Sequence, residues 1–378
     1  MDINNLALQL HQLHKGKITI ALRDSDELTR EKLSAYYSPG VGAVSQAVAA
    51  DPSKLPLYTW TNNLVAVISD GSAVLGLGNI GPEGAMPVME GKALLFKHFA
   101  DIDSVPIVLN VHSADEIVAT VKAIAPSFGA INLEDIAAPI CFEVEERLKA
   151  VLPIPIMHDD QHGTATVTLA GLINAMKVTG RQLKDCKIVI VGAGAAGVAI
   201  AKLLEKYAQP TIIAVDSKGI ISQQRTDLNE SKQLLLQYTN HHNLVGSIDD
   251  AVLNADVFIG VSQPGLLTAE MVKTMAHDPI IFALANPVPE IMPEVAKAAG
   301  AAIVATGRGD FPNQVNNAIA FPGIFRGALD NHVHTITDEH KIAAAEVIAS
   351  LVEAPSADEI IPSVFNEQLV PRIANVIR

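Results

Sequence analysis

Aromatic side chains and cysteines are scarce in this 378-residue chain, and both shortages limit what it can be. Aromatic residues make up 4% of the chain whereas hydrophobic residues make up 49%, so the core must consist mainly of Ala, Val, Ile and Leu. The two cysteines, Cys141 and Cys186, form no CxxC pair, and we expect buried thiols. A chain of this length buries about three quarters of its unfolded surface and needs no disulfide to fold.

Positive charge and long apolar runs are also in short supply. Lys and Arg number 27 against 41 Asp and Glu, a net charge of −14, and no basic stripe stands out, so nucleic-acid binding is not expected. The uncharged stretch from Ile188 to Ala201 has 14 residues, three of them glycine, and is too short to span a bilayer. The start, MDINNLALQL, lacks the basic region of a signal peptide. We expect a cytoplasmic protein with no membrane partner.

Short apolar runs alternate with helical patterns, which favours βαβ units and parallel sheets in an α/β fold. We expect the first thirty or so residues to be helical, and further helices over Asp115–Ala125 and Thr164–Val178. Two α/β domains are expected, over residues 1–160 and over 161–307. Residues 308–378 would return to the first domain. The expected strands are Leu64–Ile68, Val105–Val111, Ala130–Leu133, Ile188–Val191, Thr211–Val215, Val257–Val261, Ile280–Ala285 and Ala302–Ala305.

One of two GxGxxG segments has the context of a dinucleotide-binding loop, between an expected strand and a helix over Val198–Lys206. Its first glycine permits a tight turn, the second lets the backbone approach a pyrophosphate, and the third packs helix on strand. Amides at the start of the helix would bind the phosphates. The loop consists of Gly192, Ala193, Gly194, Ala195, Ala196 and Gly197.

Asp216 stands 24 residues after the first glycine of this loop, at the end of the next expected strand. A carboxylate at that position can accept hydrogen bonds from both ribose hydroxyls, which favours NAD and repels the extra phosphate of NADP. Lys218 weakens this preference, because a nearby cation could accommodate that phosphate. The sequence therefore favours NAD, with NADP as the alternative.

The other GxGxxG segment runs from Gly76 to Gly81 and has a different context. It is followed by Pro82 and Pro87, a composition that we do not expect to open a helix. About 20 residues further on there is no acidic residue at the end of an apolar strand, as a dinucleotide site would require. We expect a glycine-rich turn that shapes a cleft.

Acidic residues follow two apolar runs. Glu134 and Asp135 come after Ala130–Leu133, and Asp160 follows Ile154–Met157. Neighbouring strand residues point to opposite faces, so Glu134 and Asp135 can reach one ion only where the strand has ended. Three carboxylates from two strand ends would make an oxygen-rich site suited to Mg²⁺ or Mn²⁺. Otherwise they are solvated or cap a helix.

His158 and His162 form an H-x-x-x-H pair, the spacing found in some zinc sites. The residue after His158 is Asp instead of the Glu of HExxH, and we expect the segment to be a loop. Hydrogen bonds within that loop are the expected role of both histidines.

Candidate acids, bases and ligand-orienting amides stand near turns and strand ends. Tyr37 lies beside a Pro-Gly turn that could hold a phenol in a cleft. Lys92 follows a glycine at the expected start of a helix, where the helix N-terminus or a nearby metal would lower its pKa. Asn286 and Asn317 follow strands on the cofactor side, where amides often orient ligands. Each could instead be a packed, solvated or turn residue.

Taken in order, these motifs resemble the malic enzymes, specifically their short bacterial type. Several long motifs in one order are a far more specific signal than a single glycine loop. They are YSPGVG at Tyr37, SDGSAVLGLGNIGPEGAMPVMEGK ending at Lys92, NLED at Glu134, HDDQHGTA at Asp160, VGAGAAG at Gly192, ALANPVPE at Asn286 and TGRGDFPNQVNNAIAFPGIFRGALD around Asn317.

The resemblance implies oxidative decarboxylation of L-malate to pyruvate and CO₂ with reduction of NAD(P). Glu134, Asp135 and Asp160 would hold Mn²⁺ or Mg²⁺, which would act as a Lewis acid on the C2 oxygen. The resemblance also implies a homodimer, and it makes residues 1–160 the substrate- and metal-binding α/β domain and residues 161–307 a Rossmann-type NAD-binding domain.

The same resemblance implies roles for the remaining candidates. Lys92 would take the proton from the C2 hydroxyl while hydride passes to the nicotinamide, and Tyr37 would protonate C3 of enolpyruvate. Asn286 and Asn317 would contact the substrate or the nicotinamide. Larger family members grip a malate carboxylate with an arginine at a position where this chain has Ser72-Ala73.

Three alternatives remain open at this point. A metal-dependent oxaloacetate decarboxylase would use the same metal, Lys92 and Tyr37 with no net redox change. An amino-acid dehydrogenase with a similar layout would not need the three carboxylates. A non-catalytic NAD-sensing module would bind the cofactor without turnover.

Overall fold

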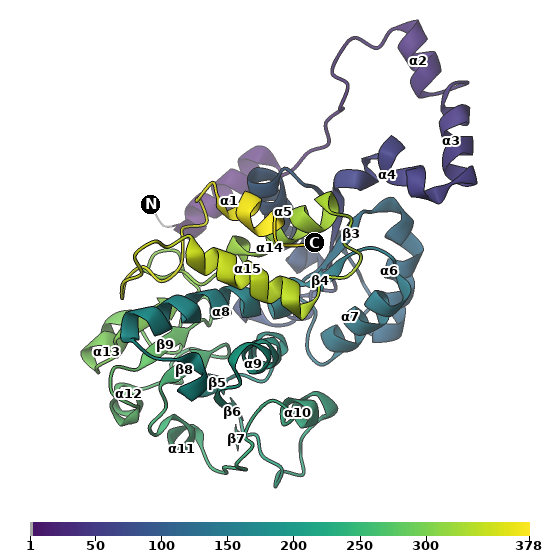
Figure 1. Ribbon diagram of the computed structural model, residues 1–378. Coiled ribbons are helices and arrows are strands. Elements are labelled where there is room, and N and C mark those ends of the chain that lie inside the picture. The colour runs from purple at the N-terminus through teal and green to yellow at the C-terminus, as the bar shows by residue number, and fades with distance from the viewer. Residues whose placement is uncertain (1–2) are drawn as a thin grey trace.

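The computed structural model describes residues 3–378 and contains two mainly parallel sheets, each flanked by helices (Figure 1). The first sheet has the strand order β2-β1-β3-β4, and all of its neighbours are parallel. Strands β1 and β3 are buried along their whole length, which is why they read as continuous apolar runs. The strands are β1 (Leu64–Ser69), β2 (Asp103–Val108), β3 (Ala130–Leu133) and β4 (Ile156–His158).

The second sheet has the order β10-β9-β8-β5-β6-β7, in which only β7 is antiparallel to its neighbour among the described strands. The order in which strands are added reverses at β5, with β6 and β7 on one side of it and β8, β9 and β10 on the other. This is the topology of a Rossmann-type sheet, in which ligands bind beyond the carboxyl ends of the strands. The expected α/β fold is thus confirmed, and each expected strand is present with ends that differ by up to three residues. The strands are β5 (Lys187–Val191), β6 (Thr211–Asp216), β7 (Gly219–Ile220), β8 (Val257–Gly260), β9 (Ile280–Ala283) and β10 (Ile303–Thr306).

Helices cover the sheets and connect them. Within residues 3–378, no helix combines the length and apolar character that crossing a bilayer would take. The α-helices are α1 (Ile3–His14), α2 (Arg30–Tyr36), α3 (Val41–Ala50), α4 (Leu55–Tyr58), α5 (Gly81–Ala100), α6 (Ala114–Ile124), α7 (Ile140–Val151), α8 (Asp159–Thr179), α9 (Ala195–Ala208), α10 (Glu230–Leu235), α11 (Ile248–Val252), α12 (Ala269–Thr274), α13 (Pro293–Ala298), α14 (Phe321–Asp330), α15 (Asp338–Ser350) and α16 (Leu369–Ala374).

The C-terminal helices pack against helices of the first half of the chain. The ring of Phe96, on α5, meets the rings of Phe321 and Phe325, on α14, edge to face at centroid distances of 4.7 and 5.2 Å. The Asn174 amide of α8 donates hydrogen bonds to the carbonyls of Ala349 and Ile360. Helix α8 is buried over most of its surface, which explains why its sequence carries so few charges.

Three expectations about helices are wrong. Helix α5 begins at Gly81, directly after the glycine-rich turn, because Pro82 in the first turn needs no amide partner and has a helical φ. Helix α8 begins at Asp159, so the segment around His162 that was expected to be a loop is helical. Asp159 and Asp160 in its first turn stabilise this start, because their negative charge interacts with the positive end of the helix dipole. The first thirty residues are helical only over α1, and the chain from Lys17 to Arg23 has no regular structure.

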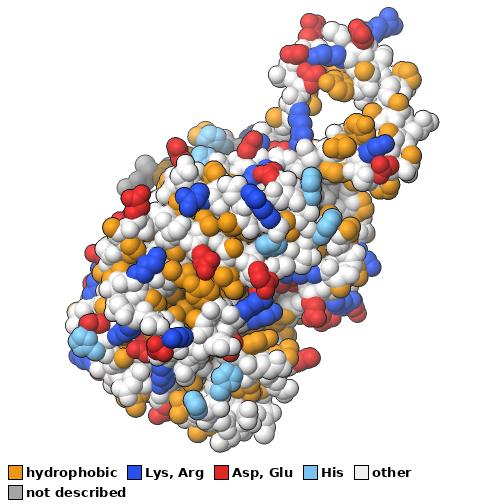
Figure 2. Space-filling model, in the orientation of Figure 1, with side chains coloured by type: hydrophobic (Ala, Val, Ile, Leu, Met, Phe, Trp, Pro, Cys, Tyr) orange, Lys and Arg blue, Asp and Glu red, His pale blue; other side chains and the backbone are white. Residues whose placement is uncertain are grey.

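An N-terminal arm, which we define as residues 24–50, extends from the rest of the chain and carries α2 and α3 (Figure 1). Neither helix buries a single side chain. Hydrophobic side chains lie at the surface of the arm, as Figure 2 shows, and Leu28, Leu33 and Tyr36 are among those exposed. Within the described residues, the apolar side chains of the arm are therefore left largely uncovered.

Candidate active site

Three carboxylates meet where β3 and β4 end. These strands are parallel neighbours in which Leu133 pairs with His158, so the residues that follow them lie at the same edge of the sheet. Glu134 and Asp135 come directly after β3, and Asp160 is in the first turn of α8. Their ligand oxygens all lie within 4.8 Å of one another.

The local backbone explains how two adjacent residues serve one site. Asp135 has φ of +54°, a left-handed conformation that ends the strand and turns the chain. Its amide donates to the Asp160 carboxylate at 2.8 Å, which ties the two chain segments together. A cluster of three carboxylate oxygens has the donor chemistry that Mg²⁺ and Mn²⁺ prefer, so the residues fit such an ion.

Glu134 is buried and held from two sides. Its carboxylate accepts from the Asn132 amide at 2.8 Å and lies 2.9 Å from the Lys92 ammonium. Burial raises the pKa of Glu134 to about 7, although Lys92 opposes this rise. A bound divalent cation would favour the charged carboxylate instead.

Lys92 projects from α5 into this cluster. Its Nζ lies 2.5 Å from Asp159, donates to the Asn317 amide oxygen at 3.2 Å, and sits 4.6 Å from the centre of the Phe321 ring. Lys92 is well inside α5, so the expectation of a lysine at a helix N-terminus with a lowered pKa is wrong. Burial disfavours the ammonium, but Asp159 and Glu134 outweigh it and raise the pKa of Lys92 above its usual value.

Asp159 is a functional candidate that the sequence interpretation passed over in favour of its neighbour Asp160. Its side chain is fully buried, and burial raises its pKa to about 6 although Lys92 opposes the rise. The helix makes room for it with Gly163, where a Cβ atom would lie 1.9 Å from Asp159 Oδ1. The signals in the sequence were the Asp-Asp pair at a strand end and the glycine four residues later.

The two histidines do not face one site. His158 is buried in β4, whereas His162 lies on α8 with Nε2 2.8 Å from the Glu145 carboxylate and Nδ1 3.1 Å from the Lys341 ammonium. Hydrogen bonds within a loop were expected for them. His162 instead bonds to two other helices, α7 and α15.

The glycine loop after β5 has the geometry of a dinucleotide-binding turn. Gly192 has φ of +119°, and its amide donates to the Val215 carbonyl at 2.9 Å. A Cβ atom at Gly194 would meet nothing within 4 Å, whereas one at Gly197 would lie 1.8 Å from the Gly192 carbonyl oxygen. The second glycine is thus open for a ligand, and the third allows α9 to pack closely on the loop.

The segments after β9 and β10 meet the first glycine-rich turn. A Cβ atom at Gly76 would lie 1.9 Å from the Asn286 carbonyl oxygen, and one at Gly307 would lie 2.7 Å from the Asn286 amide nitrogen. Glu290, which the sequence analysis did not single out, accepts the amides of Ser262 and Ala285 and so fixes the chain just before Asn286. Asn286 and Asn317 therefore belong to different contacts, the first at this junction and the second beside Lys92.

Tyr37 is the predicted site residue that the chain does not bring to the carboxylates. It follows α2 on the N-terminal arm and is 69% exposed. The groups around the Lys92 ammonium come from α8, from the chain after β3, and from residues 317–321.

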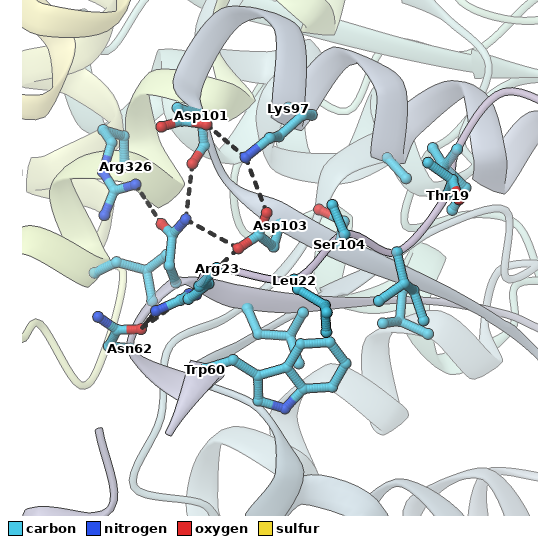
Figure 3. Close-up of a pocket in the computed structure, with 18 of the residues that line it drawn as sticks. Thr19, Leu22, Arg23, Trp60, Asn62, Lys97, Asp101, Asp103, Ser104 and Arg326 are labelled. Carbon is cyan, nitrogen blue, oxygen red and sulfur yellow. Dashed lines mark hydrogen bonds and ion pairs between the residues drawn. The ribbon is translucent and has the colours of Figure 1, made fainter. Parts of the chain in front are cut away.

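A cavity of about 970 Å³ lies elsewhere, between the extended segment Ile18–Arg23 and the edge strand β2. In Figure 3, Lys97 bridges Asp101 and Asp103 at one side of it, and Trp60 lies at the other. None of the predicted catalytic, metal or cofactor residues lines it. The candidate active site is therefore the carboxylate cluster and not this cavity.

Known proteins resemble this chain over nearly its whole length. Residues 17–149 match the family model for the malic enzyme N-terminal domain, and residues 161–376 match that for the malic enzyme NAD binding domain. A bifunctional malic/malolactic enzyme of Bacillus subtilis is 54% identical over 381 residues, covering 100% of this chain and 92% of that protein. The crystal structure of an NAD-dependent malic enzyme from Thermotoga maritima superposes with a TM-score of 0.95 at 49% identity, covering 98% of each chain. The chain belongs to the malic enzyme family.

Proposed function

We propose that this protein converts L-malate to pyruvate and CO₂ and reduces NAD or NADP, with a divalent metal ion required. The observation that carries the proposal is the contact between Lys92 and Glu134, 2.9 Å apart. It puts a group that can exchange protons beside one of three carboxylates suited to a metal ion. A substrate whose C2 oxygen lies on that ion would be within reach of the lysine.

Glu134, Asp135 and Asp160 would hold Mg²⁺ or Mn²⁺. When bound, such an ion supplies a Lewis acid that stabilises negative charge on the C2 oxygen. As the neutral amine, the form that a divalent cation held beside it would favour, Lys92 takes the proton of the C2 hydroxyl, and Asp159 orients its Nζ from 2.5 Å. The burial of these groups excludes water, which strengthens each electrostatic contact.

We also propose a homodimer in which Tyr37 of the partner subunit completes each site and protonates C3 of enolpyruvate. The N-terminal arm supports this, because α2 and α3 bury no side chain within one chain and expose apolar residues. Such an arm gains its stability by packing on a second copy, and exchange of an element between protomers is a known route to dimers.

The dinucleotide would bind at the carboxyl ends of the second sheet, with its pyrophosphate at Gly192–Gly197. Asn286 and Asn317 would contact the nicotinamide or the substrate. In this division of labour, residues 1–160 supply the metal and proton-transfer groups, residues 161–307 supply the dinucleotide site, and residues 308–378 join the two. The proposed cofactor is NAD or NADP, because Asp216 stands where a ribose-binding carboxylate favours NAD but its side chain is bonded to Arg225 and Lys232.

The test is absorbance at the reduced-nicotinamide band with L-malate, Mn²⁺ and either NAD⁺ or NADP⁺, with and without EDTA. Reduction that EDTA abolishes, with pyruvate as product, is the expected result. No reduction of nicotinamide, combined with metal-dependent loss of added oxaloacetate, would overturn the proposal in favour of an oxaloacetate decarboxylase.

A further inference from the structure

The end of β6 lies beside the dinucleotide loop, where the adenosine ribose of a cofactor is expected. Val191 pairs with Val215 in the sheet, and the Gly192 amide donates to the Val215 carbonyl. Asp216 is the next residue, and it pairs with Gly219 in the short antiparallel ladder between β6 and β7. Figure 1 shows these two strands close to α10.

The Asp216 carboxylate is already fully engaged by donors of the chain. Oδ1 accepts from Arg225 Nη1 at 2.7 Å and from the Lys218 amide at 2.9 Å. Oδ2 accepts from Arg225 Nη2 at 3.1 Å and from Lys232 Nζ at 2.6 Å. A carboxylate has about four lone-pair positions, so two ribose hydroxyls could bind here only by displacing a cation.

Positive charge exceeds negative charge at this point. Arg225, Lys232 and Lys218 carry three positive charges, and Asp216 and Asp227 carry two negative ones, with Lys218 Nζ 2.8 Å from Asp227. The side chain of Asp216 is 6% exposed, whereas Arg225 and Lys232 are 14% and 25% exposed, so the cations form the outer layer. Burial alone would raise the pKa of Asp216, but Arg225 and Lys232 outweigh it and lower the pKa, so the carboxylate is charged.

We propose that Arg225 and Lys232 bind the 2′-phosphate of NADP, and that Asp216 serves as their counter-ion in place of a ribose ligand. The proposal rests on the proposed function and deepens it by assigning cofactor specificity to named residues. A phosphate can accept two parallel hydrogen bonds from a guanidinium, as the Asp216 carboxylate does here. Because a phosphate monoester carries a charge of about −1.5 to −2 at pH 7, it more than offsets the single excess positive charge that NAD would leave.

Arg225 and Lys232 would bind the phosphate in different ways. Arg225 directs Nε and Nη2 at Asp227 at 2.9 Å and Nη1 also at the Gly219 carbonyl at 3.4 Å, so its planar group is oriented before a ligand arrives. Because all five N–H groups are engaged, a phosphate would take the place of the Asp227 carboxylate on the Nε–Nη2 edge. Lys232 is a single point charge on α10 that can move from Asp216 to a phosphate oxygen with little rearrangement. The chain would thus favour NADP over NAD.

The test measures binding of two cofactor fragments by titration calorimetry on the full chain, without malate. The fragments are ADP-ribose and its 2′-phosphorylated form. We expect the phosphorylated fragment to bind at least about tenfold more tightly, and Arg225→Ala and Lys232→Ala each to reduce that advantage about tenfold or more. Affinity for ADP-ribose should not fall, because each variant frees acceptor positions on Asp216. Arg225→Lys should restore part of the advantage, which loss of folding would not.

Lys202→Ala is the matched control, because Lys202 lies on α9 with a side chain 51% exposed and 3.9 Å from Asp338, away from this cluster. Equal affinity for the two fragments in the unaltered protein, or a loss of both affinities in Arg225→Ala that Arg225→Lys does not restore, would overturn the proposal. Since the fragments bind without catalysis, failure of malate oxidation would count against the proposed function and leave the phosphate site standing.

Discussion

The Lys92 ammonium lies 2.5 Å from the Asp159 carboxylate in a pocket where both side chains are almost completely buried, 10% and 0% exposed. Removing two charges from water is costly, and a buried pair contributes less to stability than its short distance suggests. This pair lies beside the carboxylates of Glu134, Asp135 and Asp160, so the pocket holds charged groups that a polar substrate can contact. This contact joins α5 to α8, and Glu134 and Asn317 complete the same environment.

Replacement of Lys92 should stop catalysis without stopping cofactor binding. We expect Lys92→Ala to lower kcat about 10²- to 10⁴-fold, the usual contribution of a proton-transfer group. It also leaves Asp159 and Glu134 without their cation, so some loss of thermal stability is expected. Steady-state kinetics measure the loss of catalysis, and quenching of protein fluorescence by NADH shows whether the cofactor still binds.

The control for that variant is on the same helix. Lys97→Ala removes a lysine whose side chain is 55% exposed and pairs with Asp101 and Asp103 at the surface. It should leave kcat within about twofold, because surface pairs contribute little. A Lys92→Ala protein that keeps more than a tenth of the original kcat would show that Lys92 is not the base.

Loss of any one of the three carboxylates should weaken metal binding. We expect Glu134→Gln, Asp135→Asn and Asp160→Asn to raise the Kd for Mn²⁺, measured from the electron paramagnetic resonance signal of free Mn²⁺. Glu143→Gln, on α7 with a side chain 57% exposed, is the control. Mn²⁺ at a hundred times its Kd should stabilise the native protein by about 2.7 kcal/mol. An unchanged Kd in all three variants would contradict the assignment.

A feature of this fold could be predicted from the sequence when residues close together in the chain determine it, and could not when distant residues do. Strands such as β3 and β5 were found from the sequence because a strand buried on both faces is a local apolar run. The part of helix α5 before Lys92 was missed because its proline and glycine residues argue against a helix locally, while burial of Ala85 and Met89 favours one. The pairing of Lys92 with Asp159 joins residues 67 apart, which no local pattern contains. The clustering of Glu134, Asp135 and Asp160 was predictable because strand ends in a parallel sheet share one edge.

The position of Tyr37 on an arm leads to a complementation experiment. Tyr37→Phe and Lys92→Ala should each be nearly inactive alone. If each site combines Lys92 of one chain with Tyr37 of the partner subunit, half of the randomly formed dimers are mixed and each mixed dimer has one intact site. Activity should therefore recover to about a quarter of the original after the two variants are mixed, unfolded and refolded together. No recovery, with refolding verified on the unaltered protein, would place both residues in one chain.

Cys186 should be unreactive at neutral pH and should make stability depend on pH in the alkaline range. Burial raises its pKa to about 11 from an ordinary value of 9.0. Between these values the unfolded chain loses the thiol proton and the folded chain keeps it, so the free energy of unfolding falls as pH rises from about 9 to 11. Urea unfolding at several pH values measures this fall, and Cys186→Ala should reduce it.

Thiol labelling checks the same residue independently. At pH 8 about one Cys186 thiol in a thousand would be ionised, so an aromatic disulfide reagent should react only after denaturation. Ser350→Cys, at the exposed end of α15, provides a thiol that should react at once. Rapid labelling of Cys186 in the native protein would contradict the expected pKa.

The second and third glycines of the dinucleotide loop should respond differently to alanine. A Cβ atom at Gly197 would lie 1.8 Å from the Gly192 carbonyl oxygen, so Gly197→Ala must push α9 away and should cost about 1–3 kcal/mol of stability or more. A Cβ atom at Gly194 meets nothing within 4 Å, so Gly194→Ala should keep its Tm. The added methyl group would nevertheless occupy the space that a pyrophosphate needs, and affinity for NADH should fall about tenfold or more. Thermal unfolding and NADH titration of both variants distinguish a packing role from a binding role. If Gly194→Ala binds NADH normally, the pyrophosphate does not lie against this loop.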